Sequence, residues 1–302
     1  MLLLVGVALV FAARASAAEA KRDDAAAPDE QAVLVAEGKA LFDSVDAFGQ
    51  QPSQGPTVAG LRVSCSTCHP GPAFTDGRNH VVAQTGAGKT APRQTPHLLQ
   101  LKDTGPFSWD GRNTALQQQI RGAVTSPLEM NAAREPTARQ LDALAAFVET
   151  LDVPDATPGV DFDPVLAERG RILFDQARGT DPGQEFNVPL TVACGSCHIG
   201  PKRTDGGFHK ILMPFGDPVL DPGRVEPDGR VRGFKTPVLR GLRFTAPYFH
   251  EGLGGDPTAM RTPVNSPPRP ALLETVAFYN ERFVMGFTPE EMQALTEYLL
   301  SL

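Results

Sequence analysis

The sequence lacks the features that mark several large classes of protein. Its 302 residues contain only four cysteines and one tryptophan, and the net charge is −7. An acidic chain with no basic patch and no phosphate-binding loop argues against nucleic acid as a partner. After the N-terminal segment, no apolar run reaches the roughly 18 residues of a membrane-spanning helix. No long stretch alternates apolar and polar residues, so extended strands are not predicted.

The four cysteines all belong to two copies of one motif. Residues 65–69 read CSTCH and residues 194–198 read CGSCH, which leaves no cysteine for a disulfide or a nucleophile. This spacing lets two thiolates on one helical turn add to the vinyl groups of haem, while the next residue presents its imidazole to the iron. Zinc is the alternative, but a zinc site does not need a histidine directly after each second cysteine. The predicted attachment residues are Cys65, Cys68, Cys194 and Cys197, and the predicted iron ligands are His69 and His198.

The N-terminal segment predicts export. Residues 1–12 are apolar, and small residues follow through Ala20, with cleavage candidates at residues 15–17 and 18–20. The apolar run is shorter than a spanning helix, which favours a signal peptide over an anchor. We predict a signal peptide over residues 1–20 and a soluble periplasmic protein with no membrane span in the mature chain.

The chain repeats itself once. Gly38–Asp43 (GKALFD) recurs as Gly170–Asp175 (GRILFD), just ahead of each haem motif. Farther on, residues 95–111 match residues 236–252 without a gap. Each half then closes on an apolar stripe at helical spacing. The stripes are Leu141, Leu144, Phe147, Val148 and Leu151, and then Met292, Leu295, Tyr298, Leu299 and Leu302.

The repeat predicts a mainly α fold with two tandem cytochrome c-type domains, each with one covalently attached haem. We place the domains at residues 21–152 and 165–302, with a linker at 153–164 that is rich in proline and aspartate. Residues 253–270 form an insertion with no counterpart in the first half. It is read as a surface loop, although long loops in compact domains are often functional.

Two blocks outside the haem motifs carry a family resemblance. Residues 107–112 read FSWDGR and precede Gln119, Glu129 and Met130, while residues 234–252 contain FKTPVLR and TAPYFHEG. The chain resembles the bacterial dihaem cytochrome c peroxidase family, including its MauG branch, which oxidises residues of a partner protein. It departs from the family at Ser108, where an aromatic residue is usual, and at Ala123, where proline is frequent.

The resemblance implies that the haem on His69 reacts with peroxide and that the haem on His198 relays electrons. Glu129 would then exchange protons with peroxide, because burial makes a carboxyl competent for acid–base work. Gln119 would orient the bound oxygen, and Trp109 would relay charge between the haems. From the spacing alone, Gln119 reads as a solvent-facing helix residue, Glu129 as a cap or a partner of Arg134, and Trp109 as a core anchor.

The sixth ligand of the second iron separates the branches of the family. Peroxidases of the family have a methionine there, and MauG-like members have a tyrosine. Aligning residues 271–279 with the family's corresponding helix puts Tyr279 at this position. Because the alignment crosses the insertion, Met260 and Met285 stay open as rivals. His80 is a rival ligand for the first iron. It stands eleven residues beyond His69, as His209 does beyond His198, which favours a shared structural role instead.

The resemblance also implies a calcium ion between the domains. Its ligands would be Thr245, Pro247 and Gln94, the last of which stands where the family has asparagine. Backbone oxygens suit calcium, and the longer amide weakens the case.

The haem motifs, together with the family resemblance, leave three possible functions. The first is reduction of hydrogen peroxide with electrons from a small periplasmic cytochrome c or cupredoxin. The second is peroxide-dependent oxidation of a protein substrate through Trp109, and the third is electron transfer without catalysis. The sequence leaves the oligomeric state open.

Overall fold

The computed structural model describes residues 29–82, 85, 88–180, 191–211, 221–252 and 268–302. The signal peptide predicted at residues 1–20 lies outside these ranges. So does most of the 253–270 insertion, of which only the last three residues are described. The described chain is helix-rich with short strands, which agrees with the mainly α prediction. None of its helices is both long enough and apolar enough to cross a membrane.

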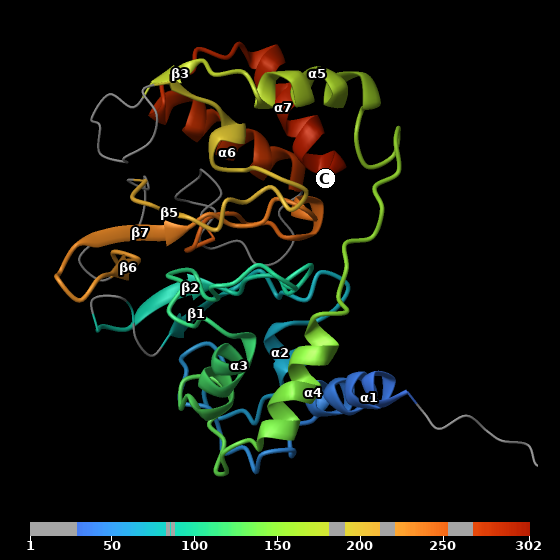
Figure 1. The fold of residues 1–302 in the computed structure, drawn as a ribbon, viewed down its shortest axis with the longest axis vertical. Coiled ribbons are helices and arrows are strands. Elements are labelled where there is room, and N and C mark those ends of the chain that lie inside the picture. Colours follow the sequence, from blue (N-terminus) through green and yellow to red (C-terminus); the bar gives the residue numbers. More distant parts are fainter. Residues whose placement is uncertain (1–28, 83–84, 86–87, 181–190, 212–220, 253–267) are drawn as a thin grey trace, which may run out of the picture.

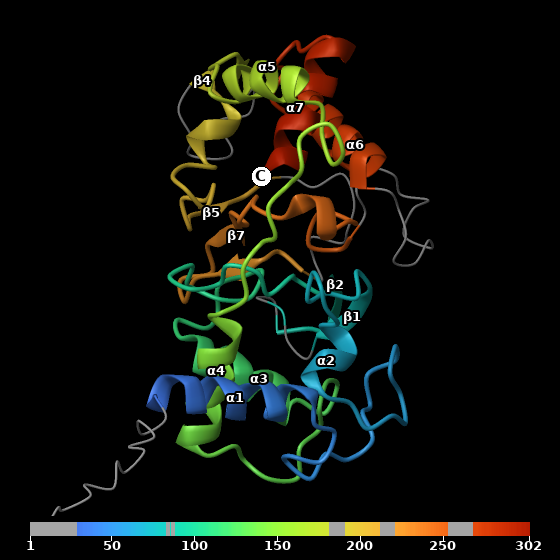
Figure 2. The same cartoon turned by 90° about the vertical axis from the view of Figure 1, so that its right-hand side faces the viewer.

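Two halves lie one above the other along the long axis, and the segment between α4 and α5 runs up one side to join them (Figures 1 and 2). Each half has its own apolar core. The N-terminal half contains α1 (Glu30–Asp43), α2 (Cys65–Cys68), α3 (Leu116–Thr125) and α4 (Ala138–Val148), with β1 (Asn79–Val82) antiparallel to β2 (Ala91–Gln94).

The C-terminal half repeats this plan around three helices. The elements are α5 (Pro164–Phe174), α6 (Pro268–Arg282) and α7 (Pro289–Ser301), the strands β3 (Gly179–Thr180), β4 (Thr191–Val192), β5 (Phe208–His209), β6 (Arg224–Val225) and β7 (Val231–Lys235), and the 3-10 turns η1 (Cys194–Ser196) and η2 (Leu242–Phe244). Strand β7 lies between β5 and β6, and both pairings are antiparallel.

Local sequence explains where the helices begin. The Asp163 side chain accepts hydrogen bonds from two backbone N–H groups at the start of α5, and Pro164 takes the first helical position. Thr137 and Thr288 each form a capping box at the starts of α4 and α7. The two predicted apolar stripes lie on α4 and α7, except that Leu151 and Leu302 come after the last helical residue. Most of the stripe side chains are buried.

The repeated glycine has a structural reason in both halves. A Cβ on Gly38 would lie 1.9 Å from the carbonyl oxygen of Ala143, and a Cβ on Gly170 would lie 2.0 Å from that of Ala294. Helix α1 therefore crosses α4, and α5 crosses α7, at a distance that only glycine allows. The predicted repeat is thus confirmed as one helix crossing used twice.

The strands were not predicted from the sequence. They are only two to five residues long, too short for alternation of apolar and polar residues to become visible. The β1–β2 pair and the β5–β7 pair lie where the two halves meet (Figure 1). These strands position the residues described next.

Candidate functional site

Each cysteine pair lies on a single turn of helix. Helix α2 carries the first pair, and η1 leads from the first cysteine of the second motif into Cys197. The backbone N–H of the following histidine donates to the carbonyl of the first cysteine, at 2.9 Å for His69 and 3.1 Å for His198. All four thiols are free and half-buried, and burial raises the pKa of each to about 11 or 12.

The two motif histidines are held in the same way. The Nδ1–H of His69 donates to the carbonyl of Phe74, and that of His198 donates to the carbonyl of Arg203, both at 2.9 Å. Burial lowers the pKa of His69 and lowers that of His198 to about 4, so both rings are neutral. A neutral ring whose Nδ1 is fixed by a carbonyl offers Nε2 to a metal.

A single cavity of about 750 Å³ reaches both cysteine pairs, and its lining comes from both halves. Most of the lining is apolar, but buried Nδ1 atoms of His97 and His250 on its wall have no hydrogen-bond partner among the described residues. A zinc site shared by the two motifs would require the four cysteine sulfurs to lie close to one point. Among the described residues they form no such cluster. Thiol pairs, neutral imidazoles and a shared apolar cavity fit two haem groups.

Glu129 and Gln119 both line the cavity. Burial raises the pKa of Glu129. Its carboxylate lies close enough to the thiols of Cys65 and Cys68 to raise their pKa as well, which places it beside the first motif. Gln118 is exposed, whereas Gln119 is half-buried and lines the cavity, so the interpretation of Gln119 as a solvent-facing helix residue is wrong.

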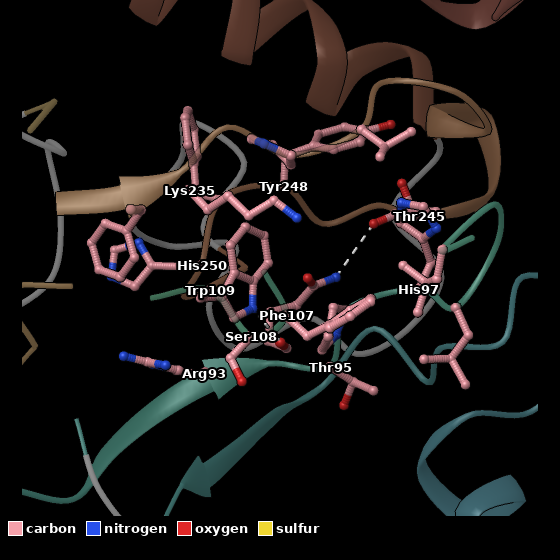
Figure 3. Close-up of a pocket in the computed structure, with 18 of the residues that line it drawn as sticks. Arg93, Thr95, His97, Phe107, Ser108, Trp109, Lys235, Thr245, Tyr248 and His250 are labelled. Carbon is pink, nitrogen blue, oxygen red and sulfur yellow. Dashed lines mark hydrogen bonds between the residues drawn. The ribbon is translucent and has the colours of Figure 1, made fainter. Parts of the chain in front are cut away.

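Gln119 is fixed by the residue that departs from the family pattern. Its Oε1 accepts hydrogen bonds from the Ser108 hydroxyl and from Asn113 Nδ2, the latter at 2.7 Å. Ser108 has a φ of +73°, in the left-handed region, and lies beside Trp109 on the cavity wall (Figure 3). With Oε1 engaged twice, the amide N–H groups of Gln119 are its remaining hydrogen-bonding groups.

Trp109 is bonded to both halves. Its indole N–H donates to the carbonyl of Gln94 at the end of β2, at 3.0 Å. Its own carbonyl accepts from the backbone N–H of Lys235 at the end of β7, at 2.9 Å. The side chain is half-buried on the cavity wall, and Figure 3 shows it between the labelled residues of the two halves. It therefore anchors the junction, and its position also suits the predicted relay.

Tyr279 lies on α6 and lines the cavity near the second motif. Burial raises its pKa, as do the nearby thiols of Cys197 and Cys194. Its ring lies against Phe278 and parallel to Phe283, with centroids 5.2 and 6.2 Å away. The rival Met285 also lines the cavity but is only 6% exposed and packs in the core. Met260 lies outside the described residues.

His80 and His209 occupy equivalent positions. His80 Nε2 bonds to Asp76 Oδ2 at 2.8 Å, and His209 Nε2 bonds to Asp205 Oδ2 at 2.9 Å. Each histidine lies within 4.8 Å of the second cysteine of its motif. An Nε2 that is already bonded to a carboxylate is not presented to an iron. The arrangement agrees with a shared structural role, in which each histidine bonds to an aspartate four residues before it.

The three predicted calcium ligands meet, but as a hydrogen-bonded set. Gln94 is 4% exposed, and its Nε2 donates to the carbonyls of Thr245, at 3.3 Å, and Pro247, at 2.9 Å. The dashed line at Thr245 in Figure 3 marks the first of these bonds. Calcium needs six to eight oxygen ligands at about 2.3–2.6 Å. An amide nitrogen that already satisfies both carbonyls does not fit this requirement.

The structure also brings together residues that the sequence did not single out. Arg93 is buried, and its guanidinium bonds to both carboxylate oxygens of Asp221, at 2.7 Å, and to Asp110, at 3.1 Å. Asp221 lies 128 residues away, so no local pattern links it to Arg93. His97 gave a weak signal, because it is a polar residue where the matching position of the second half has Val238.

A fold of two helix-rich halves with paired thiols and imidazoles on one cavity fits the class of dihaem-binding proteins, and comparisons identify the family. Residues 59–165 match the family model described as di-haem cytochrome c peroxidase. The chain is 32% identical to methylamine utilization protein MauG of Methylorubrum extorquens over 241 residues, which are 72% of this chain and 64% of that protein. It belongs to the dihaem cytochrome c peroxidase/MauG family.

Other relatives come from both branches. The chain is 25% identical to cytochrome c551 peroxidase of Pseudomonas aeruginosa over 289 residues, 83% of this chain and 81% of that protein. A crystal structure of a MauG-like protein associated with microbial copper homeostasis superposes with a TM-score of 0.62 and 22% identity, over 93% of this chain and 90% of that one. That likeness concerns the fold alone. The chain spans 64% and 63% of the length of the first curated relatives it matches.

Proposed function

We propose that the protein is a periplasmic dihaem c-type peroxidase. Cys65 and Cys68 would hold one haem, with His69 as iron ligand, at the site where hydrogen peroxide is reduced. Cys194 and Cys197 would hold the other, with His198 as iron ligand, at the site that receives electrons from a small cytochrome c or cupredoxin. Haem, when bound, supplies the iron that takes peroxide and accepts electrons.

The observation that carries this proposal is that the two cysteine–histidine motifs are held alike but have different side chains beside them. The motif histidines are held by matching bonds of 2.9 Å, yet a carboxyl with a raised pKa lies beside the first motif and a tyrosine beside the second. Reduction of peroxide to two waters takes two electrons and two protons. A buried carboxyl can accept a proton from peroxide and return it to the departing oxygen.

Gln119 and Trp109 support this division of labour. Gln119 is locked by Ser108 and Asn113, so its amide can donate a hydrogen bond to an oxygen without reorganising first. Trp109 is bonded to both halves, a position suited to carrying charge between two haems. A pure electron carrier would need neither a fixed amide nor a buried carboxyl.

Low-temperature EPR of the purified diferric holoprotein tests the proposal together with peroxide turnover. One high-spin and one low-spin signal are expected, because the first iron must have an open face. Reduced cytochrome c or cupredoxin should then be oxidised on addition of peroxide. Two low-spin signals and no turnover, before or after partial reduction, would instead identify an electron carrier.

A second candidate is favoured by Tyr279. A phenolate on the second iron would stabilise the ferric form of that haem and so make it harder for a small electron carrier to reduce. That property suits MauG-like oxidation of a partner protein better than peroxide reduction with electrons from such a carrier. The variants Tyr279→Phe and Met285→Leu separate the two ligands. Under the tyrosine assignment, only Tyr279→Phe changes the low-spin EPR signal, whereas a change confined to Met285→Leu would favour the peroxidase branch.

A further inference from the structure

The junction between the halves is built twice. Residues 95–111 match residues 236–252 without a gap, so Gln94 is equivalent to Lys235. Gln94 ends β2 and Lys235 ends β7. The backbone N–H of Gln94 donates to the carbonyl of His250 at 2.7 Å, and the backbone N–H of Lys235 donates to the carbonyl of Trp109 at 2.9 Å. Trp109 and His250 are themselves equivalent in the repeat.

The two side chains repeat the exchange. Gln94 Nε2 crosses to the C-terminal half and donates to the carbonyls of Thr245 and Pro247. Lys235 Nζ crosses to the N-terminal half and donates to the carbonyls of the equivalent residues Thr104 and Pro106, the latter at 2.8 Å. Each half therefore offers a pair of backbone carbonyls that a group from the other half must satisfy.

A pair of buried carbonyls pointing at one position calls for a cation or a hydrogen-bond donor. At the Thr104 and Pro106 position, the Lys235 ammonium is an internal cation. At the Thr245 and Pro247 position, an amide nitrogen 2.9 Å from an oxygen occupies the space that calcium would need at about 2.3–2.6 Å from the same oxygen. Both pairs of carbonyls are therefore satisfied by side chains of the chain itself, one by the Lys235 ammonium and the other by the Gln94 amide.

We infer that Gln94 closes the family's calcium position in this protein, and that the two halves are joined without a metal ion. The chain retains the other parts of such a site. Thr245 and Pro247 present their carbonyls, and the buried Oδ1 of Asn79 has no hydrogen-bond partner among the described residues. This Oδ1 and the Gln94 Cγ lie close to the same place, since a Cβ on Gly252 would be 3.2 Å from the first and 3.1 Å from the second. Shortening the amide by one methylene group should reopen the site.

The test uses the diferric holoprotein, its Gln94→Asn variant and the control Gln51→Asn, which makes the same change at an exposed glutamine. Each is dialysed against EGTA, then measured with and without excess calcium chloride. The readouts are bound calcium by mass spectrometry of the metal, thermal unfolding by circular dichroism, and the EPR signals of the two haems. None of them depends on peroxide turnover, so failure here is separate from failure of the proposed function.

The wild type and Gln51→Asn should hold well under one calcium per chain and show the same Tm in EGTA and in calcium. Gln94→Asn should lose about 2–4 °C in EGTA, because two hydrogen bonds are lost, and regain it with one bound calcium. Stoichiometric calcium in the wild type, or a wild-type Tm that falls in EGTA, overturns the inference. So does a folded Gln94→Asn that binds no calcium. If that variant does not fold, the wild-type measurements still decide.

Discussion

Glu129 and Gln119 share a cavity wall but are held in opposite ways. Gln119 is fixed by two donors, whereas Glu129 owes its properties to burial, which raises its pKa. A fixed amide suits orientation of a ligand, and a carboxyl with a raised pKa suits the exchange of protons. At the scale of single residues, this contrast is the basis for the two roles proposed here, positioning for Gln119 and proton transfer for Glu129.

Glu129→Gln tests the proton-transfer role. Peroxide turnover with a reduced donor should fall by about 100-fold or more, the usual contribution of a general acid–base group. The absorption and EPR spectra of both haems should keep their wild-type form. Glu135→Gln is the matched control, since Glu135 is an exposed residue nearby in sequence. Equal turnover in both variants would remove Glu129 from the mechanism.

The raised pKa of Glu129 also predicts a dependence of stability on pH. Below the carboxyl pKa of the unfolded chain, both states carry the proton and the buried group is neutral. As pH rises, the unfolded chain releases its proton first, because the pKa of Glu129 is higher in the folded state. The stability that comes from the neutral buried carboxyl is therefore lost as pH rises through the folded-state pKa. Urea unfolding of the holoprotein should show Glu129→Gln gaining on the wild type as pH rises from acid to neutral. A constant difference across that range would contradict the prediction.

At the scale of helices, the fold rests on the two close crossings at Gly38 and Gly170. Each glycine faces a backbone carbonyl, which cannot rotate away as a side chain would. The helices α5 and α7 carry the core of the C-terminal half, so a change in their spacing moves the residues around the second motif. Glycine is required here for close approach rather than for its backbone freedom.

Gly170→Ala should therefore destabilise the holoprotein by about 1–3 kcal/mol, the usual cost of overpacking. Alanine favours helix over glycine, so helix propensity alone would predict the opposite sign. Arg169→Ala, at the exposed neighbouring position in α5, should change stability by no more than about 0.5 kcal/mol. Urea unfolding monitored by circular dichroism measures both. A Gly170→Ala variant as stable as the control would mean that α5 and α7 can separate freely.

At the scale of the whole molecule, buried charge helps to join the halves. Arg93 pairs with Asp221, whose side chain is 1% exposed, and with Asp110, which also accepts from Arg112. Burial alone would raise the pKa of Asp110, but the hydrogen bonds from Arg112 and the charge of Arg93 lower it overall. This group lies beside the Gln94 position and holds the same junction.

Arg93→Met should destabilise the holoprotein by about 3–5 kcal/mol, because Asp221 would keep a buried charge without its partner. Arg230→Met, which removes an exposed pair with Asp228, should cost no more than about 1 kcal/mol. Urea unfolding at neutral pH distinguishes them. Similar small effects in both variants would show that Asp221 is solvated once Arg93 is gone.

The sequence predicted what is local or repeated, and missed what is distant and unique. The cysteine motifs, the glycine repeat and the two apolar stripes are periodic patterns, and the structure places each as expected. The pairing of Arg93 with Asp221, and the reach of Lys235 to Thr104, join residues more than 120 positions apart. The strands are too short to leave a pattern. Whether Tyr279 or Met285 faces the second iron depends on how α6 ends, which spacing alone does not determine.

The shared cavity has a consequence for how the protein is made. Its apolar walls come from both halves, and an apolar space of this size is costly to leave unfilled. Under the proposed function the two haems fill this space, so the halves should close fully only in a chain that carries both. Protein that lacks one haem should then be more sensitive to proteases than the holoprotein.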